Sequence, residues 1–489
     1  MRAWNFGKQL AFVAALSLGT TAYAQRLHHY AVAVDEDLAA VSVHACFAGR
    51  TPDRLVAESL DASLALERAI RGGARKPLEP NGTELRLGAS PDDSCIDYRV
   101  NLLESSGRHQ HGGNPTRRVG GDLITDLGLW FWRPETLAED EDIEVAFLLP
   151  EGISVSTPWQ RAPAAGGGVG YRIGHSAYDW PGTVAFGHFT EHNVLVPGGE
   201  LHVAILDGRP KVDEAQIIDW LQRAADAVVQ LYGRFPVASL QIVVVPGARG
   251  AGPVPSAYIL RGGGPGSHFF VNQRRPIAEF QSDWSAVHEL SHLFLPYVHS
   301  DDAWLSEGVA SYYQHILRAR AGIISPEEAW QSMHSAFQRA RVDGNGVTLA
   351  AATERMYRNG DFMRVYWEGA AIMLLADQRL RERSDGRQSL DTVLEQLRRC
   401  CLAPDVGWHA ADLFRRLDEL AGGSVFGELY AEQVKSDAFP DLAGLYRLFG
   451  FQVGADGKLT IDDAAPRRAD RDAIMTGRAH ASDVRSSLR

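Results

Sequence analysis

The stretch WSAVHELSHLFLPYVHSDDAWLSEGVASYYQ, residues 284–314, combines three histidines and two glutamates with apolar residues at helical spacing. His288 and His292 are four residues apart, so on a helix both imidazoles project from one face and can bind one metal ion. Glu289 directly follows the first histidine, where its carboxylate can reach a water molecule at that ion. Two imidazoles and one carboxylate leave the fourth position of a tetrahedral zinc ion open. The stretch therefore predicts a catalytic site with one zinc ion (Zn2+) per chain.

An amphipathic helix is the alternative interpretation of the same residues. Val287, Leu290 and Leu293 would then face the core, while both histidines would be ordinary polar-face residues. A third ligand would distinguish the two interpretations, and the second half of the stretch offers one. The helix must end near Pro296, and a following helix can bring Glu307 back towards the histidines. Glu307 is the preferred third ligand, and the competing candidates lie in the intervening loop: His299, Asp301 and Asp302.

The Trp-Leu-Ser-Glu-Gly sequence of residues 304–308 resembles the second zinc motif of gluzincin peptidases, the thermolysin-like group. Residues 306–330 and 365–397 are more similar to the glycyl aminopeptidase family, with features shared with the alanyl aminopeptidase family. The resemblance implies a thermolysin-like α+β domain, mostly helical, that acts on peptides or proteins. It also implies roles for individual residues: zinc ligands His288, His292 and Glu307, general base and acid Glu289, and oxyanion-stabilising Tyr366.

Two features depart from these families. Fourteen residues separate His292 from Glu307, fewer than in the relatives named above. The segment AYILRGGGPGSHFF, residues 257–270, also lacks the acidic residue that grips the substrate's free amine in the alanyl family. Endopeptidase and aminopeptidase activity therefore both stay open.

The region from residue 25 to 208 consists of short alternating apolar runs separated by Gly, Pro, Asn and Asp. This pattern predicts a domain of antiparallel strands in a sandwich-like arrangement. Trp130, Phe131 and Trp132 are expected in its core, with a carbohydrate-binding cleft as the alternative.

The period of the apolar residues changes at residue 212, and residues 209–435 are predicted to form the catalytic domain. Its first helix has Asp213 and Gln216 as a capping pair. Strands are expected over 240–246, 256–260 and 268–272, with a flexible hairpin near a cleft over the Gly-rich residues 261–266. Helices are expected over 284–297, 303–321, 326–341, 364–384, 389–400 and 409–421, and residues 436–489 form a C-terminal extension.

The first 24 residues have basic residues, a short apolar run and a small-x-small site ending at Ala24, which is typical of a secretory signal peptide. We expect a periplasmic, or alternatively secreted, protein without a transmembrane segment. A disulfide between Cys46 and Cys95 fits an oxidising compartment, and Cys400 and Cys401 would then form a vicinal bridge or stay reduced. The net charge of -12 argues against nucleic-acid binding, which requires a basic face.

These observations favour an exported zinc metallopeptidase. The alternative is a catalytically inactive, peptidase-like binding or scaffold protein of the cell envelope, motivated by the missing amine-gripping residue. The oligomeric state does not follow from the sequence.

Overall fold

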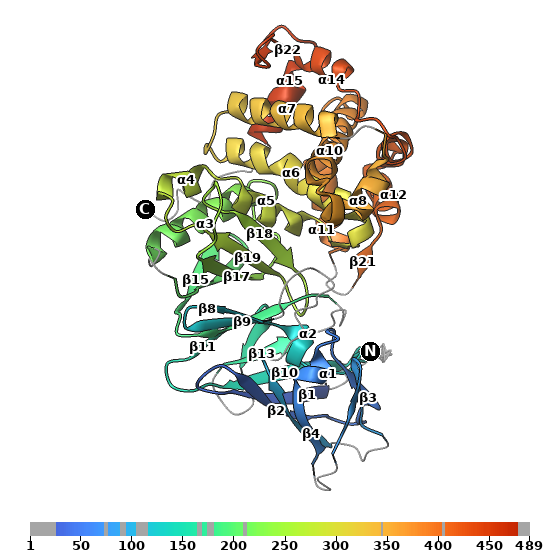
Figure 1. Cartoon of the computed structure of the whole chain (residues 1–489). Helices are drawn as coiled ribbons and strands as arrows, with labels where there is room; N and C mark the ends of the chain where they lie inside the picture. Colours follow the sequence, from blue (N-terminus) through green and yellow to red (C-terminus); the bar gives the residue numbers. More distant parts are fainter. Residues whose placement is uncertain are drawn as a thin grey trace, which may run out of the picture.

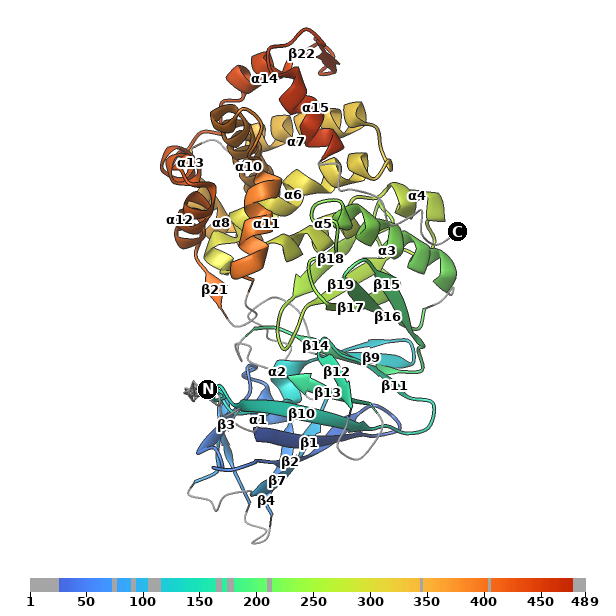
Figure 2. The same cartoon turned by 180° about the vertical axis from the view of Figure 1, so that it is seen from behind.

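The structure is a computed structural model that describes residues 26–72, 77–88, 94–103, 116–163, 169–173, 180–208, 213–343, 346–402 and 406–477. The predicted signal peptide lies outside these ranges. Figures 1 and 2 show a β-rich region at one end, helices at the other, and a mixed layer between them. None of the helices in the described ranges combines the length and apolar character needed to cross a lipid bilayer.

The β-rich region contains a large sheet and a smaller sheet that share one core. The strands of the large sheet are, in spatial order, β12 (Gln160–Pro163), β13 (Val169–Ile173), β10 (Glu141–Leu148), β1 (Arg26–Val34), β2 (Ala40–Cys46), β7 (Cys95–Asn101) and β4 (Leu66–Arg71). Those of the smaller sheet are β11 (Ser154–Ser156), β14 (Thr183–Gly187), β9 (Asp122–Asp126) and β8 (Thr116–Val119). The remaining short elements of this region are β3 (Arg54–Val56), β5 (Pro80–Asn81), β6 (Glu84–Arg86), α1 (Ala62–Ala65) and α2 (Leu127–Trp130).

The prediction of a purely antiparallel region is wrong for one central pair, because β1 and β10 run parallel. More than 100 residues of sequence separate the two strands, and alternation of apolar residues carries no information on strand direction. Trp130 and Trp132 are fully buried between the sheets, as the core interpretation expects. Their burial removes the observation that motivated a carbohydrate-binding cleft.

The middle layer is a sheet in the order β15 (Glu191–Val196), β16 (Gly199–Ile205), β17 (Ser239–Pro246), β19 (Gly266–Val271) and β18 (Ser256–Leu260). Both of its faces are buried. On β17, Leu240, Ile242 and Val244 pack beneath the helices, whereas Val243 and Val245 pack against the smaller sheet of the β-rich region. This is the period-two alternation of a strand covered on both sides. Because β15 and β16 belong to this sheet, it extends across the predicted boundary at residues 208/209.

The helical region covers the other face of the middle sheet (Figure 1). Its elements up to the proposed site are α3 (Glu214–Val229), α4 (Ile277–Ser282), α5 (Ser285–Ser291), the 3-10 turn η1 (His292–Phe294), β20 (Tyr297–Val298), the 3-10 turn η2 (Ser300–Asp302) and α6 (Ala303–Arg320). The capping pair of α3 is confirmed, since the Asp213 side chain accepts a hydrogen bond from the Gln216 backbone. The helix predicted over 284–297 is shorter, because a 3-10 turn replaces the α-helix at His292.

The other predicted helices begin and end within a few residues of their expected bounds. They are α7 (Pro326–Asp343), α10 (Phe362–Ser384), α11 (Leu390–Cys400) and α12 (Ala410–Ala421). The short helices α8 (Leu349–Glu354) and α9 (Met356–Asn359) and the short strand β21 (Gly407–Trp408) were not predicted. α13 (Val425–Leu429), the π-turn η3 (Tyr430–Val434), α14 (Ala443–Phe449), β22 (Phe451–Val453), β23 (Leu459–Ile461) and α15 (Arg468–Thr476) follow. α15 packs on α6, where Ile474 and Met475 are buried.

Candidate metal centre

The two histidines of the opening motif are buried side chains of the α5–η1 segment. The Asp283 carboxylate accepts a 2.7 Å hydrogen bond from the backbone of Ser285 and so fixes the start of α5. Leu290 and Leu293 are fully buried in the helical core. His288 and His292 are only 2% and 6% exposed. Ordinary polar-face histidines would be solvated, so the amphipathic-helix interpretation does not describe them.

Glu307 reaches this pair from the second turn of α6, which packs against α5. One of its carboxylate oxygens lies 3.2 Å from His288 Nε2 and 3.6 Å from His292 Nε2. One possible ligand atom from each of the three residues lies within 4.8 Å of the others. Three convergent donors of this kind could hold one metal ion.

The competing candidates in the loop before α6 are not part of this group. Asp302 instead accepts a hydrogen bond from the backbone of Ala410 at the start of α12 and pairs with His409. His299 stacks on the ring of His409. Of the four candidates for a third ligand, the structure therefore brings only Glu307 to the histidines.

Both imidazoles are oriented by a second hydrogen bond. His288 Nδ1 lies 2.9 Å from Gln314 Oε1, and His292 Nδ1 lies 2.8 Å from Ser306 Oγ. Both oxygens can accept a hydrogen bond, so each Nδ1 can carry the proton and donate it. In this tautomer each Nε2 keeps a lone pair directed at the centre, which is the arrangement usual for metal-binding histidines. The donor set and its orientation thus fit zinc. Gln314 was not predicted from the sequence, although it lies seven residues after Glu307 and so on the same helix face.

Arg261 positions the end of the histidine-bearing segment. Its Nη2 donates to the carbonyl oxygens of His292 and Leu295, over 2.8 and 3.2 Å. Both carbonyls lie at the end of this helical segment, and that of His292 also accepts a hydrogen bond from the Leu295 backbone over 3.3 Å. Burial lowers the pKa of Arg261 to about 10.

Arg261 begins the Gly-rich loop between β18 and β19, and this loop is wedged against the β-rich region. A Cβ atom on Gly262 would collide with the backbone oxygen of Trp180, and one on Gly264 with that of Pro158. Gly264 also has a φ of 155°. The predicted hairpin is confirmed, because β18 and β19 pair antiparallel, but its loop is closely packed where a flexible one was expected. The glycines permit close backbone approach between the two regions.

Tyr366 lies over the centre from α10. Its ring stacks on His288 with ring centroids 5.6 Å apart and 11° between the planes, and its hydroxyl donates a hydrogen bond to Glu307. The crossing of α6 and α10 explains this placement. A Cβ atom on Gly308 would lie 2.5 Å from the backbone of Gly369, so only glycines allow the helices to approach so closely.

Burial and neighbouring charges set the electrostatics of the centre. Burial raises the pKa of Glu289 to about 7, although the charge of His288 opposes this shift. Burial alone would also raise the pKa of Glu307, but His292 and His288 hold it below its usual value. Glu289 and Glu307 thus place two carboxylates beside the imidazoles, and negative charge at the centre favours a bound cation.

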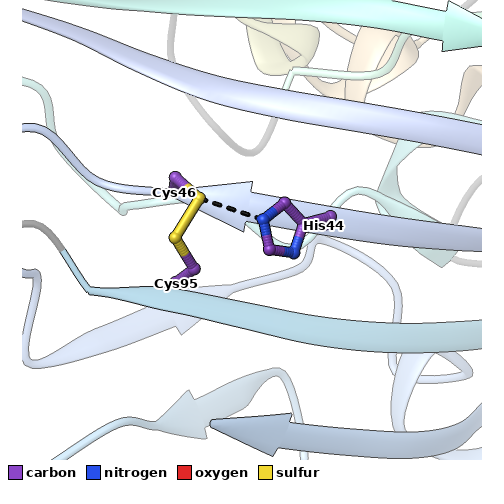
Figure 3. A group of neighbouring side chains, drawn as sticks. All are labelled: His44, Cys46 and Cys95. Atoms are coloured by element: carbon purple, nitrogen blue, oxygen red, sulfur yellow. Dashed lines mark hydrogen bonds between the residues drawn. A yellow bond between two sulfur atoms is a disulfide. The ribbon is translucent and has the colours of Figure 1, made fainter. Parts of the chain in front are cut away.

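A second group of possible ligands lies in the β-rich region, where His44 approaches Cys46 and Cys95. Figure 3 shows a disulfide joining the two cysteines across β2 and β7, with His44 Nε2 3.2 Å from Cys46 Sγ. The expected Cys46–Cys95 bridge is thus confirmed, and it leaves no thiolate for a metal. Cys400 and Cys401 form a vicinal bridge.

Comparison with known proteins shows that this centre is similar to that of a known family. Residues 271–370, which contain both histidines, Glu307 and Tyr366, match the family model of M61 glycyl aminopeptidases. The chain is a zinc peptidase that resembles the gluzincin group. The match confirms the resemblance to the glycyl aminopeptidase family, and zinc is the metal that this family implies. No curated protein matches this zinc peptidase.

Solved structures share the fold of this zinc peptidase at low sequence identity. An aminopeptidase N family protein from Idiomarina loihiensis has a TM-score of 0.64 and 14% identity, over 90% of this chain and 82% of that protein. An M1 zinc metallopeptidase from Deinococcus radiodurans has a TM-score of 0.53 and 15% identity, over 86% of this chain and 94% of that enzyme. The order of a β-rich region followed by a helical region is therefore common to these proteins.

Proposed function

We propose that the protein is an exported metallopeptidase that hydrolyses peptide bonds, with His288, His292 and Glu307 holding zinc. The convergence of three buried donors, with both imidazoles oriented by hydrogen bonds, carries the proposal. When bound, zinc supplies Lewis-acid chemistry that polarises a peptide carbonyl and makes a water molecule more acidic.

The remaining chemistry comes from two side chains at the centre. Glu289, buried beside His288, accepts the proton of the attacking water and returns it to the departing amine as the C–N bond breaks. Tyr366 donates a hydrogen bond to the oxygen that becomes negative as the carbonyl is attacked. Its contact with Glu307 and its stacking on His288 support this role, because they hold the hydroxyl at the centre.

The test replaces Glu289 by glutamine, which keeps the volume of the side chain but cannot take up a proton. Zinc content by elemental mass spectrometry should stay at one ion per chain, whereas hydrolysis of a peptide mixture should fall by about 10²-fold or more. The matched control is Glu327→Gln on the exposed face of α7, which should match the wild type in both measurements.

Retention of most activity in Glu289→Gln would refute the mechanism. Zinc bound by a wild-type chain that cleaves no peptide would instead support the inactive binding or scaffold protein. The same digest separates single amino acids from internal fragments and so decides between aminopeptidase and endopeptidase cleavage. The type of cleavage needs this test because β18, the edge strand beside α5, carries no acidic residue that could bind the free amine of a substrate.

Export to the periplasm is part of the proposal and rests on the N-terminal sequence. The Cys46–Cys95 and Cys400–Cys401 disulfides support it, since disulfides persist in oxidising compartments. N-terminal sequencing of the protein from cell fractions tests it. A mature chain that begins after Ala24 in the periplasmic fraction is expected, and an uncleaved cytoplasmic chain would contradict export.

A further inference from the structure

Exposed aromatic side chains gather around the proposed zinc centre. In the described part of the chain, the aromatic residues among the exposed large hydrophobic side chains are Tyr258, Trp284, Tyr357 and Phe362. We call the last three the aromatic rim. They are 42%, 78% and 39% exposed and come from three elements: the residue before α5, helix α9, and the first position of α10. Exposed aromatic side chains from separate elements that meet at one place are characteristic of a binding surface.

Ring contacts connect the rim to the centre from two sides. On one side, the Trp284 ring lies edge-on to His288 at 5.4 Å between centroids. On the other side, Tyr357 lies edge-on to Phe362 at 5.6 Å, and Phe362 contacts Tyr366 at 6.3 Å. Tyr366 in turn stacks on His288. The rings therefore form a continuous wall that runs past a proposed zinc ligand.

Tyr357 also lies close to the reacting groups. It is near enough to Glu307 and Glu289 to interact with the charge of both carboxylates. Its side chain is nevertheless the most exposed of the rim. A group that is both solvated and this close to the centre is available to a substrate bound there.

Two of the basic residues near the rim in sequence are paired, whereas Arg358, next to Tyr357, is exposed. Arg355 Nε lies 2.8 Å from Asp361 Oδ2, and Arg364 Nε lies 2.7 Å from Glu368 Oε2. The Arg364–Glu368 pair is buried within α10. These two cations are therefore occupied, and the rings of the rim offer apolar surface to a substrate.

We propose that the aromatic rim binds a bulky apolar side chain, aromatic or large aliphatic, that flanks the scissile bond of a peptide substrate. The inference rests on the proposed peptidase function and defines its substrate class. A glycine, alanine or charged side chain at that position would leave the ring surface exposed to water, so it would gain less binding energy from the rim.

The test uses two matched peptide series with constant flanking sequence. One series varies the residue before the scissile bond and the other the residue after it, each through Phe, Leu, Ala, Gly, Glu and Lys. In one of the series, the wild-type protein loaded with zinc should cleave the Phe and Leu peptides with a kcat/KM about tenfold or more above the Gly peptide. Trp284→Ala and Tyr357→Ala should reduce this preference mainly through a higher KM for the Phe peptide.

Leu195→Ala is the matched control, because Leu195 is 76% exposed on β15, at the opposite edge of the middle sheet from β18. It should keep the wild-type preference. Calorimetric titration of Glu289→Gln with the Phe and Gly peptides adds a binding measurement that needs no turnover. Thermal unfolding of each variant identifies any that fail to fold, and a Trp284→Phe variant then replaces Trp284→Ala.

Each outcome separates the rim from the peptidase proposal. Cleavage without an apolar preference, or a preference unchanged in both rim variants, would overturn the role of the rim and leave the peptidase proposal standing. Tighter binding of the Phe peptide by Glu289→Gln, without cleavage by the wild type, would support the rim and refute the peptidase proposal. Neither cleavage nor a difference in binding would overturn both.

Discussion

Gln314 should determine how tightly the centre binds zinc, although it does not reach the metal. Without the ion, His288 has an alternative tautomer in which Nε2–H donates to Glu307, 3.2 Å away. With the ion bound, Nε2 must keep its lone pair, so the proton has to sit on Nδ1 and needs the Gln314 acceptor. In Gln314→Leu the bound form alone would therefore contain a buried N–H without a partner.

The size of the effect follows from burial. His288 and Gln314 are each 2% exposed, so water does not replace the lost acceptor. An unsatisfied buried donor costs about 1–3 kcal/mol, which corresponds to an about 5- to 150-fold weaker zinc Kd. Competition with a chromophoric chelator measures this Kd, and thermal unfolding of the zinc-free protein shows whether the fold is kept.

Gln378→Leu is the matched control. Gln378 is also a buried helical glutamine, but its amide donates to Glu382 on α10 over 2.7 Å and contacts no proposed ligand. A zinc Kd for Gln314→Leu equal to those of Gln378→Leu and the wild type would refute the assignment of His288 Nε2 as a ligand atom.

Three further changes probe the supports of the site. Arg261→Ala removes charge-assisted hydrogen bonds to two carbonyls at the end of the histidine-bearing segment. Denaturant titration should show a free energy of unfolding about 1.5–3 kcal/mol lower than that of the wild type, with Arg261→Lys in between. Equal stability of the three proteins would contradict this role. Gly369→Ala places a methyl group against the Trp304 carbonyl and should shift α10 by about 1 Å, which should lower kcat by about 10²-fold. Steady-state kinetics equal to those of the wild type would show that close packing of α6 and α10 is not needed for catalysis. Replacing Cys46 and Cys95 by serine opens a link across 49 positions and should reduce the free energy of unfolding by about 2–5 kcal/mol, with unchanged zinc content by mass spectrometry; a metal loss would instead implicate the β-rich region in zinc binding.

The local features of the site were predictable from the sequence. The spacing of His288 and His292 implies a shared helix face, and the resemblance of residues 304–308 points to Glu307. The start of α3 followed from a capping pattern confined to four residues. Each of these features depends on neighbours within about two helical turns, which is the range over which a sequence pattern determines geometry.

Features that depend on distant contacts were not predictable. The parallel pairing of β1 with β10, and the membership of β15 and β16 in the middle sheet, result from strands meeting after long connections. The Gly-rich loop has the composition of a flexible segment, yet its glycines permit contact with residues about 100 positions earlier. The glycine content indicates which backbone conformations the loop can adopt. The conformation that it does adopt depends on the distant segments that the fold packs against it.

The close packing of the Gly-rich loop against the β-rich region limits how this protein can be recombined with its relatives. Gly262 and Gly264 fit the backbone of Trp180 and Pro158, while Arg261 at the start of the same loop holds the end of the histidine-bearing segment. The β-rich and helical regions are therefore not interchangeable modules. A chimera that joins this helical region to the N-terminal region of a relative should exchange the loop and its two facing segments as one unit. Otherwise the junction would carry either a steric clash or a gap directly behind the proposed zinc centre.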